Sequence, residues 1–136
     1  QCYDHDNCCS VDSKEYCKCY RCNTYMTSKF TADKLNLSNS DWKMTYQSRV
    51  SDVSPYWLKP YTDDELVRLA KEGKKKLVIV TPAFVTDCLE TLEEIAMEGK
   101  EEFLEAGGEK YHYVPCLNDD DDWAKLLAKW SKKVAV

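Results

Sequence analysis

The sequence has no apolar run long enough to cross a bilayer. Its longest one, LVIVTPAFV, covers only residues 77–85, whereas a membrane-spanning helix needs about 20 apolar residues. The chain also opens without a charged leader followed by an apolar core, so nothing in it signals secretion. A cytoplasmic location is therefore expected, and a peripheral contact with a membrane is left open. The first residue is Gln and not Met, which predicts a fragment or a processed chain.

An excess of positive charge is also absent. The formal net charge is -5 at pH 7, and no basic stripe offsets it, which argues against a nucleic-acid partner. Three consecutive lysines at residues 74–76 precede a predicted strand and are expected to lie in a solvated turn. The charge balance therefore favours a globular domain whose ligand is not a polyanion.

Cysteine, by contrast, is plentiful. Six of the eight cysteines fall within the first 22 residues. In a reducing compartment such a cluster more often binds metal, or is simply reduced, than it forms a disulfide framework. Cys19-x-x-Cys22 has the spacing of a metal site, and Cys8 and Cys9 are candidates to complete it. Cys17 and Cys22, however, fall on different sides of a predicted helix, so the metal site and the reduced thiols both stay open as hypotheses.

Helical and strand patterns alternate along the chain. Residues 1–12 have no periodicity and are expected to form a Cys-rich loop, and residues 13–136 to form one α/β domain. The expected order is helix 13–37, strand 42–50, helix 63–73, strand 75–84, helix 87–108, strand 110–116 and helix 119–134. This alternation predicts a parallel sheet flanked by helices, in which the β-branched strand 75–84 is covered on both faces. A doubly wound domain usually opens on a strand, so the first strand is expected upstream of Gln1.

A row of glutamates follows the strand 75–84. Glu90, Glu94 and Glu98 are one helical turn apart, where like charges repel by roughly a few tenths of a kcal/mol per pair. One reading is structural: Asp87 and Glu90 form a capping box, and the other two glutamates belong to a solvated face. The other reading is a cleft, because ligands of parallel sheets bind beyond the carboxyl ends of the strands. The row borders the stripe that is expected to be buried, which comprises Leu89, Leu92, Ile95, Ala96 and Met97.

Two stretches resemble one family of enzymes. TYQSRV and PYWLKPYTDDELVRLAKEGKKKLVIVTPAFVTDCLETLEEIAMEGKEEFLEAGGEKYHYVPCLND are similar to the C-terminal half of ferrochelatases. The resemblance runs from about Cys19, in CYRCNTYMT, to Trp130, and AFVTDCLETLEE resembles the Bacteroidetes form, in which Cys replaces a His. Ferrochelatases insert ferrous iron into a porphyrin, protoporphyrin IX or coproporphyrin, to make haem. The resemblance implies their fold, two Rossmann-like halves with the porphyrin between them.

The resemblance also implies roles for individual residues. Glu90 matches an active-site glutamate that handles the pyrrole protons and the metal, with Asp87 and Cys88 beside it. Glu94 and Glu98 match carboxylates that extend inward from it and meet the substrate Fe²⁺. The matched residues that face the macrocycle are Gln47, Ser48 and Trp57. Carboxylates are suitable hard ligands and proton acceptors for this chemistry, and crowding is expected to raise some of their pKa values.

The chain departs from the family pattern where activity is concerned. In the family, the catalytic histidine lies on the strand that opens this half, and that strand, like the whole N-terminal half, would precede Gln1. The chain alone is therefore predicted to be inactive and to need the N-terminal half as its partner. Ser51 stands where the family usually has Gly. Some ferrochelatases carry an iron–sulfur cluster of the 2Fe-2S type, whose ligands do not map onto these positions. Two alternatives stay open: a small homodimeric chelatase, although the histidines such enzymes use are lacking, and a non-catalytic metal module built on residues 2–22.

Overall fold

The computed structural model describes residues 18–49 and 57–134. Its helices and strands follow the expected order except for the strand predicted at residues 42–50. α1 (Tyr20–Lys34) and α2 (Thr62–Lys71) precede β1 (Lys76–Ile79). A long helix follows, and its three parts are α3 (Leu89–Thr91), η2 (Leu92–Glu98) and α4 (Gly99–Glu105). β2 (Lys110–Tyr113) and α5 (Asp121–Val134) come last. The predicted α/β class is confirmed, while the predicted loop 1–12 lies outside the described residues.

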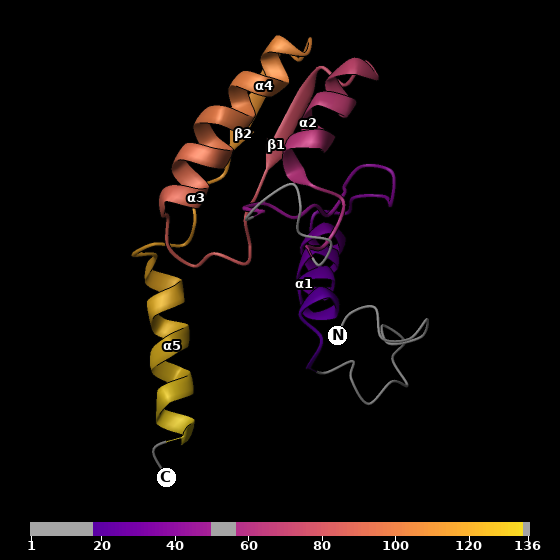
Figure 1. Ribbon diagram of the computed structural model, residues 1–136. Coiled ribbons are helices and arrows are strands. Elements are labelled where there is room, and N and C mark those ends of the chain that lie inside the picture. Colours follow the sequence, from indigo (N-terminus) through magenta and orange to yellow (C-terminus); the bar gives the residue numbers. More distant parts are fainter. Residues whose placement is uncertain (1–17, 50–56, 135–136) are drawn as a thin grey trace.

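β1 and β2 form a parallel pair that the long helix connects (Figure 1). Side chains alternate between the two faces of a strand, so every second residue of each strand points toward α2 and α4. Leu66, Ala70 and Phe103 form the buried core on that side, and the ring centroids of Phe103 and Tyr111 are 6.0 Å apart. The side chains that pack against this core are Leu77, Ile79, Ala106 and Tyr111.

The opposite face of the pair is open, so the prediction that residues 75–84 are covered on both faces is wrong for the described part of the chain. β1 ends at Ile79, and Val78 and Val80 are 65% and 47% exposed. α2 and α4 pack on each other, and α4 and η2 pack on β2, so the helical cover lies on one side of the pair. The apolar run of β1 therefore has one buried face and one exposed face.

The strand predicted at residues 42–50 is reduced to a single parallel bridge between Tyr46 and Tyr61. Backbone hydrogen bonds of 2.9 Å, one donated and one accepted by Tyr46, complete the bridge. Two residues later Ser48 has a φ of 59°, a left-handed conformation that a strand does not contain. The chain therefore turns at Ser48 instead of continuing as a strand, and this turn faces the long helix.

α1 and α5 project from the central unit in the same direction (Figure 1). Neither packs on another helix or strand of the described chain. α1 begins at Tyr20 with Cys19 as its N-cap residue, and residues 13–17 of the predicted helix lie outside the described residues. The helix meets the following loop where the ring centroids of Tyr25 and Trp42 lie 5.8 Å apart. α5 has no buried residue. None of the described helices combines the length and the apolar character that crossing a membrane requires.

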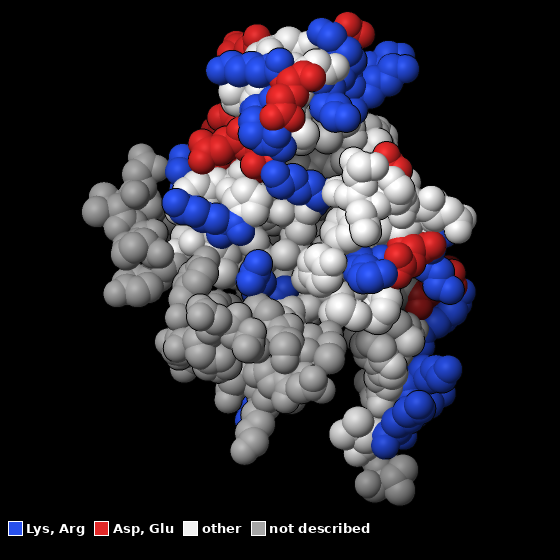
Figure 2. Space-filling model, turned by 90° about the vertical axis from the view of Figure 1, so that its right-hand side faces the viewer, with Lys and Arg blue, Asp and Glu red and all other residues white. Residues whose placement is uncertain are grey.

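Charges of both signs are interspersed over the upper part of the face drawn in Figure 2. Several ion pairs lie around α2: Lys43 Nζ lies 2.6 Å from Glu65, and Arg68 pairs with both Glu65 and Glu72. The hydrogen bond from Arg68 lowers the pKa of Glu65, and that from Lys43 acts in the same direction. Around α2, acidic side chains are thus balanced locally, in contrast to the pocket described next.

Candidate functional site

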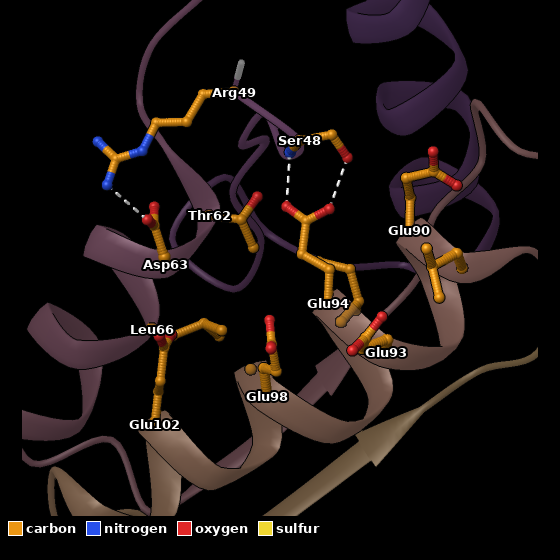
Figure 3. Close-up of a pocket in the computed structure, with 13 residues that line it drawn as sticks. Ser48, Arg49, Thr62, Asp63, Leu66, Glu90, Glu93, Glu94, Glu98 and Glu102 are labelled. Atoms are coloured by element: carbon orange, nitrogen blue, oxygen red, sulfur yellow. Dashed lines mark hydrogen bonds and ion pairs between the residues drawn. The ribbon is translucent and has the colours of Figure 1, made fainter. Parts of the chain in front are cut away.

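A pocket of about 490 Å³ lies between the turn at Ser48, α2 and the long helix (Figure 3). Its only cation among the described lining residues is Arg49, whose guanidinium lies 2.8 Å from Asp63. The carboxylates that line it are Asp63, Glu90, Glu93, Glu94, Glu98 and Glu102. Six carboxylates against one guanidinium give the pocket a strongly negative potential, which raises the local concentration of cations.

The glutamates of the pocket form a row because the middle of the helix is π-helical. In an α-helix a step of four residues overshoots a full turn by about 40°, so four residues at this spacing would fan over roughly 120°. η2 is a π-helix, whose i→i+5 hydrogen bonds add nearly one residue to each turn. In the π-helical part a step of four residues therefore falls short of a full turn. This shortfall offsets the overshoot of a four-residue step in the α-helical part. Glu90, Glu94, Glu98 and Glu102 consequently all reach one pocket.

The π segment also changes which residues are buried. Thr91, Ile95 and Phe103 are 0–2% exposed, and together with Gly99 they form a buried row with the same four-residue spacing. The prediction that Leu89, Leu92 and Met97 are buried is wrong, since they are 69%, 48% and 66% exposed. That prediction assumed α-helical periodicity throughout. The acidic row nevertheless borders the buried row, as the sequence indicated.

Ser48 binds the carboxylate of Glu94 through two donors (Figure 3). Its backbone N–H lies 2.5 Å from Oε1 and its hydroxyl 2.6 Å from Oε2. The Gln47 amide donates to the carbonyl oxygen of Glu90 at 2.7 Å, and the Trp57 indole N–H donates to the Gln47 carbonyl at 3.1 Å. The three residues predicted to face a macrocycle are therefore brought together. Gln47 and Ser48 contact the helix, and of the three Ser48 lines the pocket.

The start of the long helix differs by one residue from the predicted capping box of Asp87 and Glu90. Cys88 is the N-cap residue, and its backbone N–H donates to the Thr91 hydroxyl at 2.9 Å. Thr91 thus takes the role that the structural reading gave to Glu90. The carboxylate of Glu90 is exposed and lines the pocket instead.

The pKa values of the row shift in opposite directions at its two ends. A hydrogen bond from Cys88 lowers the pKa of Glu90, followed by one from its own backbone N–H. Burial raises the pKa of Glu102, and the charges of Asp63 and Glu98 raise it further. The expected upward shift is therefore not found at Glu90, and it is found at Glu102, which the predicted row did not include. At neutral pH Glu90 is therefore ionised, as a proton acceptor must be.

Asp87 lies beyond the carboxyl ends of the strands and is not among the residues that line the pocket. Its Oδ2 accepts from Asn118 Nδ2 at 2.7 Å, and its Oδ1 accepts from the Tyr113 hydroxyl at 2.5 Å and from the Cys116 N–H at 3.3 Å. The Asn118 hydrogen bond, followed by that of Tyr113, holds the pKa of Asp87 well below its usual range. Its own N–H donates to Asn118 Oδ1 at 2.8 Å. Asp87 thus ties the start of the long helix to the loop after β2.

Sequence reasoning missed Asp63, Arg49, Glu93 and Glu102 in the pocket, and Asn118 in the network around Asp87. Glu102 continues the four-residue spacing of the row, so its signal was present in the sequence. Asp63 and Arg49 come from other parts of the chain, and no local pattern links them to the row. Asn118 lies two residues beyond the predicted strand 110–116, at the end of a strand where ligands of parallel sheets bind.

The structure describes the second predicted metal site only in part. Cys8 and Cys9 lie outside the described residues, while Cys19 precedes α1 and Cys22 is buried, with 6% exposure. In residues 18–49 and 57–134, no group of three or more His, Cys, Asp or Glu side chains has a geometry that could hold a metal ion. An iron–sulfur cluster on these cysteines therefore stays a prediction.

Comparisons with known proteins identify the family of this chain. The family model for ferrochelatase matches residues 7–135. The chain is 44% identical over 128 residues to the ferrochelatase of Pseudomonas fluorescens strain Pf0-1, an alignment that covers 93% of this chain and 37% of that protein. It is 41% identical over 133 residues to the ferrochelatase of Bdellovibrio bacteriovorus, covering 98% of this chain and 39% of that protein. The chain thus spans little more than a third of the length of these curated relatives. It belongs to the ferrochelatase family.

Proposed function

We propose that this chain forms one wall of the cleft in which a ferrochelatase inserts ferrous iron into a porphyrin. The observation that carries the proposal is the row of Glu90, Glu94 and Glu98, which lines an open pocket instead of a solvated face. Carboxylate oxygens suit a divalent cation of intermediate hardness. The carboxylates are arranged as a row and do not converge on one point, which fits a metal that is a substrate in transit.

The reaction replaces two pyrrole N–H protons with one Fe²⁺, so two protons leave the macrocycle for each iron inserted. In the proposed mechanism Glu90 accepts the first of them, because its carboxylate lines the pocket and is ionised at neutral pH. Glu94 and Glu98 lie one and two turns further along the same side of the helix and carry protons or Fe²⁺ along the pocket. Ser48 fixes the orientation of Glu94 through its two hydrogen bonds.

The residues flanking Glu90 take different roles in this proposal. The Cys88 thiol acts on Glu90 by favouring its ionised form. Asp87 is assigned a positioning role in place of proton transfer, because its carboxylate is already engaged by three donors from the β2 side. Gln47 and Trp57 hold the turn against the helix, and the exposed part of the Trp57 ring borders the macrocycle.

The proposal includes a partner. A flat macrocycle needs two walls, and the pocket described here supplies one. We propose that the other wall, with a histidine that acts beside Glu90, corresponds to the remaining length of the relatives, and that the 136-residue chain alone does not turn over. A cytoplasmic location, a peripheral membrane contact and a homodimeric or purely metal-binding role stay predictions.

A chimera tests the proposal. In the ferrochelatase of Pseudomonas fluorescens Pf0-1, the matched segment is replaced by this chain, and iron insertion into protoporphyrin IX is followed by the loss of porphyrin fluorescence. The chimera is expected to turn over, and the isolated chain is not. Turnover by the isolated chain would overturn the need for a second wall.

Paired substitutions in the chimera test the row itself. Glu90→Gln is expected to lower kcat by about 10²–10⁴-fold, the usual effect of losing a general base. Glu101 is an exposed carboxylate on the same helix outside the pocket lining, and Glu101→Gln is expected to leave kcat within about twofold. Equal effects of the two substitutions would remove Glu90 from the mechanism.

A further inference from the structure

The long helix changes its hydrogen-bond register where η2 meets α4. In a π segment each N–H donates to the carbonyl five residues earlier, and in an α-helix to the carbonyl four residues earlier. At the change from π to α, one carbonyl therefore receives no hydrogen bond from a backbone N–H of the helix. The N–H of Gly99 donates to the carbonyl of Glu94, five residues back, and Gly99 is also the first residue of α4. The carbonyl without a donor from the helix belongs to the residue after Glu94, which is Ile95.

This carbonyl accepts a hydrogen bond from another element. The Tyr111 hydroxyl, from β2, lies 2.7 Å from the Ile95 carbonyl oxygen. Ile95 is only 2% exposed, and a buried carbonyl without a partner is unfavourable. We infer that Tyr111 is the positioning residue that holds the π-helical register of η2. Burial raises the pKa of Tyr111, so its hydroxyl stays protonated and remains a donor at neutral pH.

Gly99 supplies an independent observation. A Cβ at this position would lie 3.2 Å from the Tyr111 hydroxyl oxygen and 2.9 Å from Cδ1 of Leu66. The φ of Gly99 is -60°, so its backbone conformation is open to any residue and does not explain the glycine. The missing side chain leaves the space through which the Tyr111 hydroxyl reaches the helix backbone.

The inference has a consequence for the site, and this consequence rests on the proposed function. If the helix were α-helical throughout, the part after the π segment would turn by about one residue, roughly 100°, relative to the part before it. Glu90, Glu94, Glu98 and Glu102 would then fan over roughly 120°, with Glu102 the furthest from the side occupied by Glu90. Tyr111 does not line the pocket, yet through the backbone it determines whether the four carboxylates share one side.

Amide hydrogen exchange on the 136-residue chain tests the role of Tyr111. Tyr111→Phe removes the hydroxyl and keeps the ring, and Tyr25→Phe, on the exposed side of α1, is the matched control. Exchange in residues 95–102, measured relative to exchange in α2, is expected to rise roughly tenfold or more in Tyr111→Phe, because a buried carbonyl loses its donor, and to stay unchanged in Tyr25→Phe. A general loss of stability would raise exchange in both regions equally, and that result would overturn the inference.

A deletion provides the second variant. Removing Ala96 takes out the extra residue of the π segment, so the helix can keep its α-helical register and no carbonyl is left without a donor from the helix. In this background Tyr111→Phe is expected to change exchange by less than about twofold. If Tyr111→Phe alone prevents folding, the double variant is expected to fold. An effect of equal size in both backgrounds, or loss of folding in both, would show that the hydroxyl acts independently of the register.

Titration with Co²⁺ separates this inference from the proposed function. The unaltered chain is expected to bind Co²⁺ at the acidic row, and Tyr111→Phe to bind it several-fold more weakly. If the unaltered chain does not bind Co²⁺, that result counts against the cation-handling role of the row, while the exchange data still decide the role of Tyr111. If both proteins bind Co²⁺ equally, the proposed link between the register and the row is overturned.

Discussion

Ser48 is the residue in the pocket whose geometry is most specialised. Its left-handed φ of 59° directs both the backbone N–H and the hydroxyl to Glu94, a conformation that is unfavourable for residues other than Gly and Asn. Ser48→Ala removes the hydroxyl and keeps the strain, and is expected to destabilise the chain by about 1–2 kcal/mol, as for a hydrogen bond to a charged group. Ser48→Gly loses the same hydroxyl but relieves the strain, so it is expected to cost less. Urea denaturation measures the free energy of unfolding of both variants. A larger loss of stability for Ser48→Gly than for Ser48→Ala would show that the left-handed φ of Ser48 is not strained.

Asn118 governs the pH dependence that Asp87 contributes. The folded-state pKa of Asp87 is depressed, first by Asn118, so its contribution to stability is present above the unfolded pKa of about 3.9 and is lost as the pH falls through the lower folded value. Asn118→Ala is expected to bring the folded pKa of Asp87 back toward the unfolded one. The variant should therefore be less stable at pH 5–7, and the difference should narrow below about pH 4.

Urea unfolding between pH 3 and pH 7 measures this effect, with Asn39→Ala, at an exposed loop position, as the control. A difference between Asn118→Ala and the unaltered chain that is the same at every pH would show that Asn118 acts without Asp87.

Of the residues in the pocket, the sequence predicted those whose position depends on spacing within one helix. Glu90, Glu94 and Glu98 follow from their periodicity, because side chains one turn apart share a side of a helix. Asp63 and Arg49 could not be predicted, since tertiary folding brings them to the row from α2 and from the turn. The turn at Ser48 was taken for a strand, because its left-handed φ is set by the contact with Glu94 and not by a turn-forming residue such as Gly.

At the scale of elements, the helix after β1 was predicted correctly in its existence and incorrectly in its register. The shift from α to π depends on one inserted residue and on a donor from β2, and neither changes the composition of the segment. The predicted buried stripe therefore failed at Leu89, Leu92 and Met97. The acidic row and the buried row both have a four-residue spacing. This spacing indicated the π segment, and the assumption of a regular α-helix missed it.

Gly99 gives this element its test. Gly→Ala inside a helix usually stabilises by about 0.5–1 kcal/mol, but here the new Cβ would lie 2.9 Å from Cδ1 of Leu66. Gly99→Ala is therefore expected to destabilise the chain by about 1 kcal/mol, since overpacking costs about 1–3 kcal/mol. Combining it with Leu66→Ala, which removes Cδ1, is expected to give a favourable coupling of about 0.5 kcal/mol or more in a double-mutant cycle. Additive effects would mean that Leu66 is not the obstacle.

At the scale of the whole molecule, the apolar pattern of β1 predicted more cover than the described residues provide. Val78 and Val80 are exposed on the open face of the sheet, although a continuous β-branched run is typical of a strand buried on both sides. An apolar pattern indicates that a strand is buried on both faces, and the covering side chains can come from any segment or chain that packs on it. The chain spans little more than a third of the length of its relatives.

α5, like β1, exposes apolar side chains. Its apolar side chains recur at helical spacing, and Leu127, Trp130 and Val134 are 43%, 50% and 84% exposed, while no residue of the helix is buried. An apolar stripe of this kind favours association, so the isolated chain is expected to self-associate as its concentration rises. Trp130→Glu is expected to weaken this association by about tenfold or more, because burying one large apolar side chain contributes about 1.5–3 kcal/mol.

Sedimentation velocity over a range of concentrations measures the association, with Ser131→Glu as the control. That substitution adds the same charge at the neighbouring, exposed position of α5, about 100° away around the helix, so it is expected to leave the association largely unchanged. Equal weakening by both substitutions would assign the effect to charge and not to the apolar stripe. A chain that stays monomeric at every concentration would show that the exposed side chains of α5 do not drive association.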